Sequence, residues 1–429
     1  MAFTIAYLPL SKQSGEGVEA MQNVLISGAS VAGPVLAYWL RQYGFEPTIV
    51  ERTPALRHGL GGHAVDLFGS GVEVARRMGI GEAVQAARTR TELMTLFRNG
   101  KKPVEINVDK LSSGISDRHV EILRGELTSL LYDATRDRVE YLFGDSIATL
   151  NDDGQGVDVT FEHSEPRRFD LVIGADGMHS TVRRLAFGPE ESMRRPLGGY
   201  LGVYSMPDEL ALGNRMFVHM EIGKIASTYG VHQTGQARAA FLFRRREELQ
   251  YDYRDKDQQK RILADEFRDY GWEVPRLLKH LDAAEDFYFD SITQITLDSW
   301  QRGRIGLVGD AGYCPGPAVG GGTSLAVVTA YVLAGELAAA RADLPSGLRN
   351  YENKIRRFVD LSRAVGPKVM GSIIPDSATA LRAVPIAASV LPHLPLWVQR
   401  KLWSQNGVGK ALDSLPLPDY SDLIRVPQS

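Results

Sequence analysis

One stretch near the start of the chain restricts the possible folds more than any other. Residues 23–52 contain an apolar strand, a helix and a second apolar strand in succession, which is the length of one βαβ unit, about thirty residues. The first strand is followed by Gly28-x-Ser30-x-x-Gly33. This is the spacing of a dinucleotide-binding turn with serine in place of the second glycine. A serine is small enough to let a pyrophosphate approach, and its hydroxyl can donate a hydrogen bond.

An acid stands at the end of the second strand of this unit. Glu51 occupies the place where a carboxylate would accept hydrogen bonds from a ribose. Gly28 would permit the tight turn, and Gly33 would let the helix pack closely on the strand. A glycine motif alone is weak evidence, but strand, helix, second strand and acid in register predict a nucleotide-binding site on a parallel sheet.

A second glycine-rich turn lies late in the chain, within residues 304–323. A buried strand ends there in Gly309-Asp310, a loop of glycine and proline follows, and a long apolar helix begins near Thr323. A helix N-terminus leaves backbone N–H groups unpaired and carries partial positive charge. Such a site suits an anion, or a ring that becomes anionic when it is reduced. Taken alone, the stretch is also compatible with an ordinary strand–loop–helix crossover.

Two segments between these turns also lead from a strand to a polar residue. Residues 169–177 form an apolar strand and a Gly-Ala-Asp-Gly turn that contains Asp176, and a strand at 120–123 leads to Arg124 at the start of a helix. A capped strand-to-helix crossover would explain Asp176, and a position on the surface would explain Arg124, without any role in binding. Next to a nucleotide site, both residues become candidates for cofactor contacts.

The middle and the end of the chain have a different character. Between residues 195 and 300, strand-like pieces alternate with turns and a charged helical stretch, which predicts a second, mostly antiparallel sheet. The nucleotide domain resumes near residue 303, so the sheet domain is inserted into it. After Gly366 several prolines interrupt an apolar sequence, and short helices are expected there.

Composition excludes several classes of protein. The 429 residues are 44% hydrophobic and 24% charged, as in a globular protein, and the net charge of −3 argues against nucleic acid as a partner. The single cysteine, Cys314, excludes an intrachain disulfide and favours a reducing, cytoplasmic location. No apolar run reaches about 18 residues, so no membrane span is expected. Residues 1–20 are interpreted as a disordered leader rather than a secretory signal.

Three motifs in a fixed order carry a family resemblance. They are Gly28-x-Ser30-x-x-Gly33 with Glu51, then Gly174-Ala175-Asp176-Gly177, and then Gly309-Asp310-Ala311. Together they resemble the single-component, or group A, FAD-dependent aromatic hydroxylases typified by para-hydroxybenzoate hydroxylase, over residues 21 to about 361. Within that group, the stretch 61–71 (Gly-Gly-His-Ala-Val-Asp-Leu-Phe-Gly-Ser-Gly) is most similar to the tetracycline-inactivating monooxygenases and their actinobacterial relatives.

The resemblance implies an α/β fold, α+β overall. A Rossmann-like FAD-binding domain would carry an inserted, mostly antiparallel β-sheet substrate domain and a C-terminal helical segment. The FAD-binding domain is expected to be discontinuous, with residues 21–95, 118–190 and 300–365. The substrate domain is expected at 96–117 and 191–299, and the helical segment at 366–429.

The same resemblance implies roles for individual residues. FAD is expected to bind non-covalently at the turns described above, with NADPH or NADH as a transient reductant that Arg57 could reach. Pro315 and Pro317 are expected to line the substrate pocket. No catalytic side chain and no metal site are expected, because the flavin carries the chemistry. The expected cofactor-binding residues are Gly28, Ser30, Ala32, Gly33, Glu51, Arg52, Arg57, Asp66, Arg124, Asp176, Gly309, Asp310, Gly320, Gly322 and Thr323.

The implied activity is hydroxylation of an aromatic or polycyclic small molecule with NAD(P)H and O₂, through a flavin C4a-hydroperoxide. Two alternatives share the same motifs. One is a flavin-dependent dehydrogenase or oxidase that inserts no oxygen, and the other is a flavin-binding protein without turnover. A monomer or a homodimer is expected. Antibiotic inactivation and biosynthetic tailoring are both compatible with the sequence, because substrate choice is expected to lie in residues 195–300.

Overall fold

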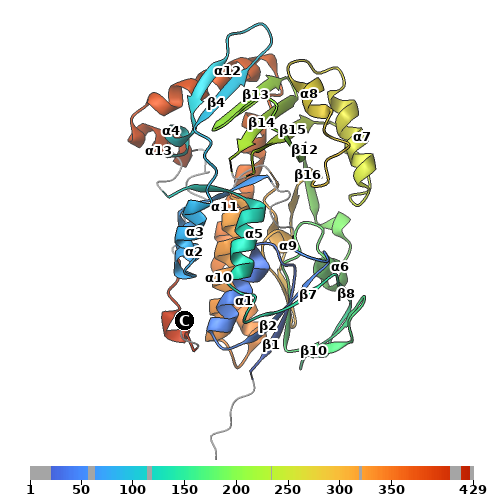
Figure 1. Ribbon diagram of the computed structural model, residues 1–429. Helices are drawn as coiled ribbons and strands as arrows, with labels where there is room; N and C mark the ends of the chain where they lie inside the picture. Colours follow the sequence, from blue (N-terminus) through green and yellow to red (C-terminus); the bar gives the residue numbers. More distant parts are fainter. Residues whose placement is uncertain are drawn as a thin grey trace, which may run out of the picture.

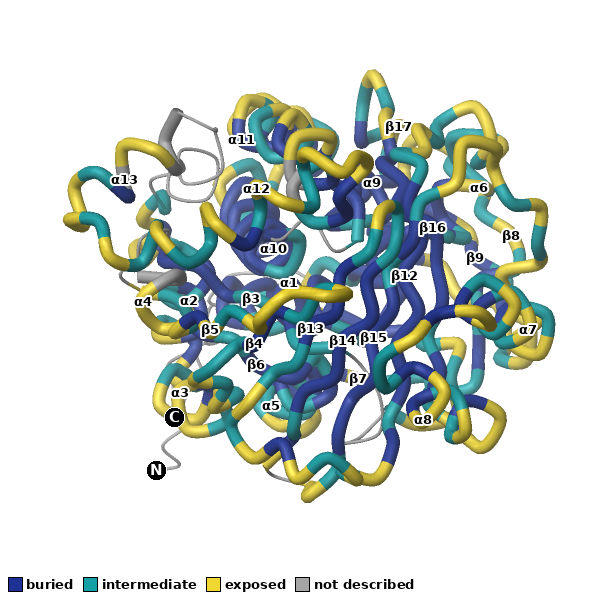
Figure 2. The backbone as a smooth tube through the Cα atoms, turned by 90° about the horizontal axis from the view of Figure 1, so that it is seen from above, coloured by how far each residue is buried: buried dark blue, intermediate teal, exposed yellow. Residues whose placement is uncertain are grey.

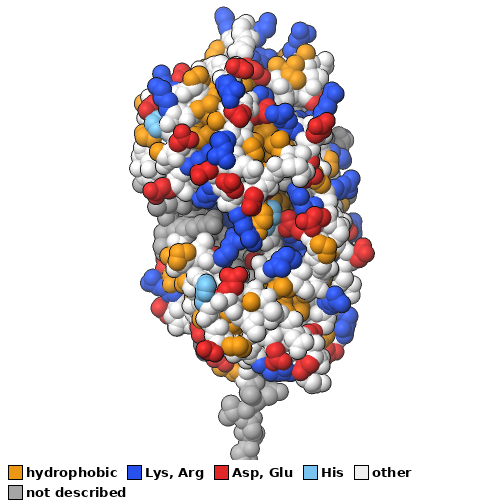
Figure 3. Space-filling model, turned by 90° about the vertical axis from the view of Figure 1, so that its right-hand side faces the viewer, with side chains coloured by type: hydrophobic (Ala, Val, Ile, Leu, Met, Phe, Trp, Pro, Cys, Tyr) orange, Lys and Arg blue, Asp and Glu red, His pale blue; other side chains and the backbone are white. Residues whose placement is uncertain are grey.

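We describe a computed structural model of the chain, in residues 21–56, 63–113, 118–232, 234–317, 321–405 and 417–425. Figure 1 shows two halves that are each built on one large sheet, a lower half around β1 and β2 and an upper half around β12 to β16. Figure 2 shows that the buried backbone follows the strands and the helix α10, whereas the outer helices are exposed on one side. On the face in Figure 3, acidic and basic side chains are interspersed. The mixed α/β architecture confirms the expected fold class.

The sheet of the lower half has six strands and is parallel except for one edge strand. In spatial order the strands are β17 (Gln301–Arg302), β18 (Ile305–Leu307), β11 (Leu171–Gly174), β1 (Asn23–Ser27), β2 (Glu46–Glu51) and β7 (Glu140–Phe143). The helix α1 (Ala32–Gln42) joins β1 to β2, so the expected βαβ unit is confirmed. All of β11 and nearly all of β1 are buried, which is typical of parallel strands with both faces covered.

The register of this sheet brings three distant turns to one edge. Ser27 pairs with Val50 and with Gly174, and Gly174 pairs with Leu307. Because these parallel strands run in the same direction, the residues that follow them leave from the same carboxyl edge of the sheet. The three sequence motifs therefore lie side by side although they are far apart in the chain.

The upper half holds a seven-stranded, mostly antiparallel sheet. One face packs on the helices α7 (Lys256–Phe267) and α8 (Val274–Leu278) in an aromatic core, and the other is turned toward the lower half. Its early strand β4 spans the domain boundary expected at residue 95. The spatial order is β16 (Tyr288–Ile295), β12 (Arg194–Pro207), β15 (Gln236–Arg244), β14 (Lys224–Val231), β13 (Arg215–Glu221), β4 (Leu93–Phe97) and β5 (Val104–Asn107).

Two small sheets and the remaining helices complete the described chain. The small sheets are β8 (Ile147–Asp152), β9 (Val157–Phe161) and β10 (Arg167–Phe169), and β3 (Ala64–Leu67) with β6 (Val120–Leu123). The helices are α2 (Gly69–Arg77), α3 (Gly81–Ala86), α4 (Val108–Ser113), α5 (Arg124–Asp133), α6 (Thr181–Phe187), α9 (Asp310–Tyr313), α10 (Gly322–Ala339), α11 (Leu344–Ile373), α12 (Ala378–Val390) and α13 (Leu396–Gln405).

The helix α10 forms the centre of the lower half. It packs against α1, α2 and α11, and most of its side chains are buried. In length and composition it could cross a membrane, with a mean hydropathy of 1.4, yet 72% of it is buried inside the structure. One such helix is weak evidence for a membrane span, because the buried core helix of a globular domain meets the same criteria.

The helix α11 is longer than expected. It continues through Pro367 to Ile373, and α12 has Pro385 inside it, whereas short helices are expected after Gly366. A proline inside a helix leaves the carbonyl four residues earlier without its N–H partner. Here the Gln294 side chain supplies the missing donor, since its Nε2 lies 2.7 Å from the Arg363 carbonyl. A side chain of the upper sheet thus allows the helix to pass through its proline.

Candidate functional site

The first and second turns touch at the carboxyl edge of the six-stranded sheet. Gly28 has a φ of 107°, and a Cβ there would lie 2.6 Å from the Ala175 carbonyl oxygen. A Cβ on Gly33 would lie 2.0 Å from the Gly28 carbonyl oxygen. Glycine is therefore required at both positions, as the sequence motif predicts. The helix α1 begins at Ala32 without a side-chain cap, so its first N–H groups face this edge.

The third turn closes the same edge. Gly309 has a φ of 66°, and a Cβ there would lie 3.5 Å from the Cβ atoms of both Ala32 and Ala326. The start of α1, the end of β18 and the start of α10 thus converge. The helix α10 begins after Gly321, which is left-handed, and it too has no side-chain cap. Two helix N-termini therefore present partial positive charge to one place.

Ser30 and Arg124 are brought together although the sequence predicted them separately. The Arg124 guanidinium donates to the Ser30 hydroxyl from Nε at 3.2 Å and from Nη2 at 3.0 Å. The serine that replaces a glycine therefore holds a cation over the start of α1. A cation beside two helix N-termini is suited to a pyrophosphate.

The acid at the end of β2 faces back toward the first turn. Glu51 accepts from Ala29 N at 2.9 Å and from Thr53 N at 3.0 Å. One carboxylate oxygen therefore lies beside the glycine turn, where the motif places an acceptor for a ribose. Arg52, which follows it, is exposed.

Asp66 lies where β3 meets the start of α10. Its carboxylate is 2.7 Å from His119 Nε2, and its backbone carbonyl accepts from the Ser324 hydroxyl at 3.2 Å. Burial lowers the pKa of His119, but the hydrogen bond and the charge of Asp66 raise it above the ordinary value overall. The contact with Ser324 fixes β3 against the first turn of α10.

The carboxylate of Asp176 accepts hydrogen bonds from neighbouring residues of the chain. It accepts from Thr181 N at 2.8 Å, from the Ser180 hydroxyl at 2.5 Å and from the Ser27 hydroxyl at 3.2 Å. These bonds cap α6 and tie its start to β1. Burial raises the pKa of this carboxyl, which the hydrogen bonds partly offset. Asp176 therefore shapes the turn between the first and third motifs.

Asp310 is the acid at the centre of the converging turns. Burial raises the pKa of its carboxyl, and nearby Arg124 and the thiol of Cys314 oppose that rise. The following residue is held by Arg183, a fully buried side chain whose Nη1 donates to the Ala311 carbonyl at 2.8 Å. The carboxylate is thus placed on a short, fixed helix rather than on a loose loop.

The remaining predicted residues divide into two groups. Pro315 is buried, and a Cβ built on Gly322 would lie 3.7 Å from its ring. The proline loop therefore borders the first turn of α10, which contains Gly322 and Thr323. Pro317 is half-buried at the end of this loop. Arg57 and Gly320 lie outside the described residues.

Sequence reasoning assigned no role to three aromatic or imidazole groups that lie between the two halves. The rings of His63 and Tyr288 are 5.6 Å apart, and Tyr229 accepts from Ala64 N at 3.1 Å. Burial and nearby Arg124 lower the pKa of His63 to about 4, so the ring is neutral at physiological pH. Burial raises the pKa of Tyr288 well above its usual range. His63 lies in the stretch 61–71, but no motif marks Tyr229 and Tyr288, because strand alternation shows that a residue faces inward but not what it faces.

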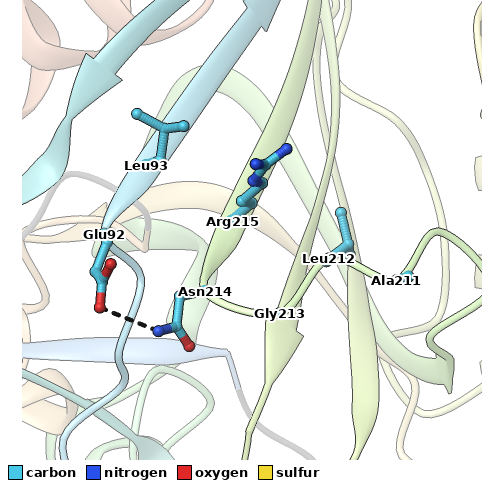
Figure 4. Close-up of a pocket in the computed structure, with 7 residues that line it drawn as sticks. All are labelled: Glu92, Leu93, Ala211, Leu212, Gly213, Asn214 and Arg215. Carbon is cyan, nitrogen blue, oxygen red and sulfur yellow. Dashed lines mark hydrogen bonds between the residues drawn. The ribbon is translucent and has the colours of Figure 1, made fainter.

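A separate shallow depression lies on the upper half, between β4 and the loop before β13. It is lined by Glu92, Leu93 and residues 211–215, and the Asn214 side chain donates to Glu92 Oε1 at 3.0 Å across it (Figure 4). None of the predicted cofactor-binding residues lines it. The converging turns, not this depression, hold the chemistry-bearing side chains.

Known proteins match most of the chain. A family model described as an FAD binding domain matches residues 21–361. An uncharacterised protein of Mycobacterium tuberculosis is 44% identical over 342 residues, 79% of this chain and 91% of that protein. A flavin-dependent monooxygenase of Legionella longbeachae is 38% identical over 82% of this chain and 90% of its own length. The crystal structure of tetracycline destructase Tet(55) is similar with a TM-score of 0.79 and 35% identity, over 93% of this chain and 99% of that one.

Proposed function

Because the chain belongs to the FAD binding domain family and matches a flavin-dependent monooxygenase over 82% of its length, we propose that it hydroxylates an aromatic or polycyclic small molecule held between its two sheets. It is an FAD-dependent monooxygenase, an oxidoreductase that takes electrons from NADPH or NADH. One observation supports the site above all others. The strand register brings Gly28, Asp176 and Gly309 to one edge, where the starts of α1 and α10 converge.

The residues at this edge fit a dinucleotide. The two glycines of the first turn leave no room for a Cβ and so permit close approach of a pyrophosphate. The Arg124 guanidinium would bind the phosphates together with the N–H groups at the start of α1. Glu51 would accept hydrogen bonds from the ribose, and Asp310 would accept them from the ribityl chain.

Bound FAD would supply the activation of O₂ and the transfer of one oxygen atom. The chain would supply the surroundings of the reacting ring. The start of α10 at Gly322-Thr323 would stabilise negative charge that develops on the ring. Neutral His63 and the hydroxyl of Tyr288 would offer hydrogen bonds without adding charge. The upper sheet would cover the ring and keep out water, and Pro315 would line the pocket.

We propose that each of the two large sheets forms one domain. The six-stranded sheet with its helices would form the FAD-binding domain, and the seven-stranded sheet would form the substrate domain, which includes β4 and β5 from the early part of the chain. We infer a discontinuous FAD-binding domain for that reason. A cytoplasmic location and a monomer or homodimer remain predictions.

The function is tested with purified protein that contains FAD. Polycyclic phenols, with tetracyclines included because Tet(55) is a tetracycline destructase, are screened for stimulation of NADPH and NADH oxidation. The product is then examined for oxygen from isotopically labelled O₂. Label in the product is expected. Oxidised product without label would instead indicate a dehydrogenase or oxidase. A flavin that never bleaches with either nicotinamide, with or without compound, would indicate a binding protein without turnover.

A further inference from the structure

A buried cation without an ionic partner lies in the upper sheet. Arg238, on β15, is only 1% exposed. Its Nε has no hydrogen-bond partner, and Nη1 makes one long contact of 3.5 Å with Gln236 Oε1. Within the described part of the chain, no carboxylate forms an ion pair with it. Burial of an unpaired guanidinium is unfavourable, so this residue lowers stability unless something else binds to it.

The strand register fixes the direction in which Arg238 faces. Arg238 pairs with Tyr229 of β14 on one side and with Ser205 of β12 on the other, and directly paired residues point to the same face of a sheet. Tyr229 packs with Leu123 and Ala64 of the lower half. Arg238 therefore faces the lower half of the molecule, and not the aromatic core under α7 and α8.

None of the described carboxylates near this face forms an ion pair with the cation. Asp286, one of these acids, accepts instead from the Ser205 backbone N at 2.9 Å and from the Ser205 hydroxyl. Two residues further along the strands, the same face carries Val203 and Ala240, which are apolar. The donors of Arg238 are thus left for a molecule that enters between the sheets.

We propose that Arg238 binds an anionic oxygen of the substrate, either a carboxylate or an ionised enol or phenol. The inference rests on the proposed function, because it takes the molecule between the sheets to be the substrate. A guanidinium is a planar fork of donors that suits a pair of oxygen atoms and always carries its charge. The substrate class is therefore aromatic anions, and neutral compounds of the same shape bind more weakly.

Binding to the oxidised FAD enzyme, without NADPH, tests this inference separately from turnover. Two matched pairs of probes are compared by the change in the flavin spectrum: naphthoate with naphthamide, and hydroxynaphthoquinone with its methyl ether. The first pair tests a carboxylate and the second an ionised enol. We expect the anion of at least one pair to bind about tenfold or more tightly than its neutral partner. If neither anion is preferred by the wild-type enzyme, the inference is wrong.

Variants then test whether Arg238 causes the preference for anions. Arg238→Gln should abolish the anion preference with the FAD content unchanged, and Arg238→Lys should retain much of it. The control is Arg244→Gln, on the same strand, where the side chain is 3.4 Å from Asp376. It removes the same charge six residues further along the strand, where a carboxylate already pairs with it, and should leave the preference intact. If Arg238→Gln keeps the wild-type preference, Arg238 is not the anchor.

Thermal stability distinguishes a binding residue from a structural one. A structural arginine would lower the melting temperature when it is replaced, whereas an unpaired buried cation should leave it unchanged or higher in Arg238→Gln. A clear fall in the melting temperature of Arg238→Gln, with the anion preference retained by the folded fraction of that variant, would assign Arg238 to the fold and overturn the inference. Anion preference without any oxygen insertion would leave the anchor in place and contradict only the hydroxylase function.

Discussion

At the scale of single residues, Asp310 connects the cofactor site to the rest of the chain. It follows Gly309, whose φ of 66° favours glycine, and it lies near Arg124 and Cys314. We predict that Asp310→Ala releases FAD, because a lost hydrogen bond to a charged group costs about 1.5–3 kcal/mol, which is roughly tenfold to a hundredfold in affinity. The FAD-to-protein ratio after gel filtration measures the effect.

The matched control is Asp137→Ala, an acid whose side chain is 88% exposed. It should keep its flavin. An Asp310→Ala protein that retains full flavin and full coupling of NADPH oxidation to hydroxylation would show that this carboxylate does not hold the cofactor.

Single residues were predictable where a turn demanded a particular residue type. Gly28, Gly33 and Gly309 stand at positions where a Cβ would collide or where φ is positive, and their spacing in the chain is visible without a structure. Tyr288 and Arg238 were not predicted, because each is one inward residue among many in an alternating strand. What makes them unusual is the absence of a partner or the presence of a neighbour from another element.

At the scale of elements, α11 depends on a side chain from the opposite half. Gln294 is buried, and its Nε2 donates to the Arg363 carbonyl at 2.7 Å and to the Pro315 carbonyl at 3.0 Å. We predict that Gln294→Leu lowers the free energy of unfolding by about 2 kcal/mol or more, because two buried carbonyls lose their donor. Unfolding in urea at saturating FAD measures the change.

A double-mutant cycle tests the reason for this loss. Pro367→Ala restores a backbone N–H that can bond to the Arg363 carbonyl. The cost of Gln294→Leu should then be smaller in the Pro367→Ala background than in the wild type. An equal cost in both backgrounds would mean that Gln294 does not replace the missing helix donor.

The same contact explains why helix length was predicted well for α10 and poorly for α11. The apolar run near residues 324–340 is continuous, and the structure has a helix at Gly322–Ala339. For α11, Pro367 is a local stop signal. The donor that overrides it belongs to a strand far away in the sequence, so no local pattern could show it.

At the scale of the whole molecule, sheet membership was predicted in outline and its contacts were not. Periodicity separated a parallel, buried sheet from a later antiparallel one. It did not show that β4 would join the antiparallel sheet beside β13. Nor did it show which ionised groups would meet where the halves touch, because those groups come from turns and strands that are distant in the chain.

One such meeting place is formed by His179, in the turn after β11, and Asp290 of β16. His179 lies 3.0 Å from Glu190 through Nδ1 and 3.5 Å from Asp290 through Nε2. Its ring stacks on Tyr253 at 4.2 Å. Burial alone would lower the pKa of this imidazole, but the two carboxylates raise it to about 9. The protonated ring thus joins the lower half to the upper sheet.

The raised pKa predicts a dependence of stability on pH. An unfolded histidine has a pKa of about 6.5, so between about 6.5 and the folded value of about 9 the folded chain holds a proton that the unfolded chain lacks. The stabilisation is complete below the lower value and disappears as the pH rises through the higher one, at up to about 1.4 kcal/mol per pH unit. His179→Gln should therefore unfold more easily than the wild type at pH 6.5 and about equally above pH 9. Urea unfolding at saturating FAD measures this, with exposed His163→Gln as the control. A wild type and a His179→Gln variant that lose stability in parallel over this range would show that His179 does not join the two halves as an ion.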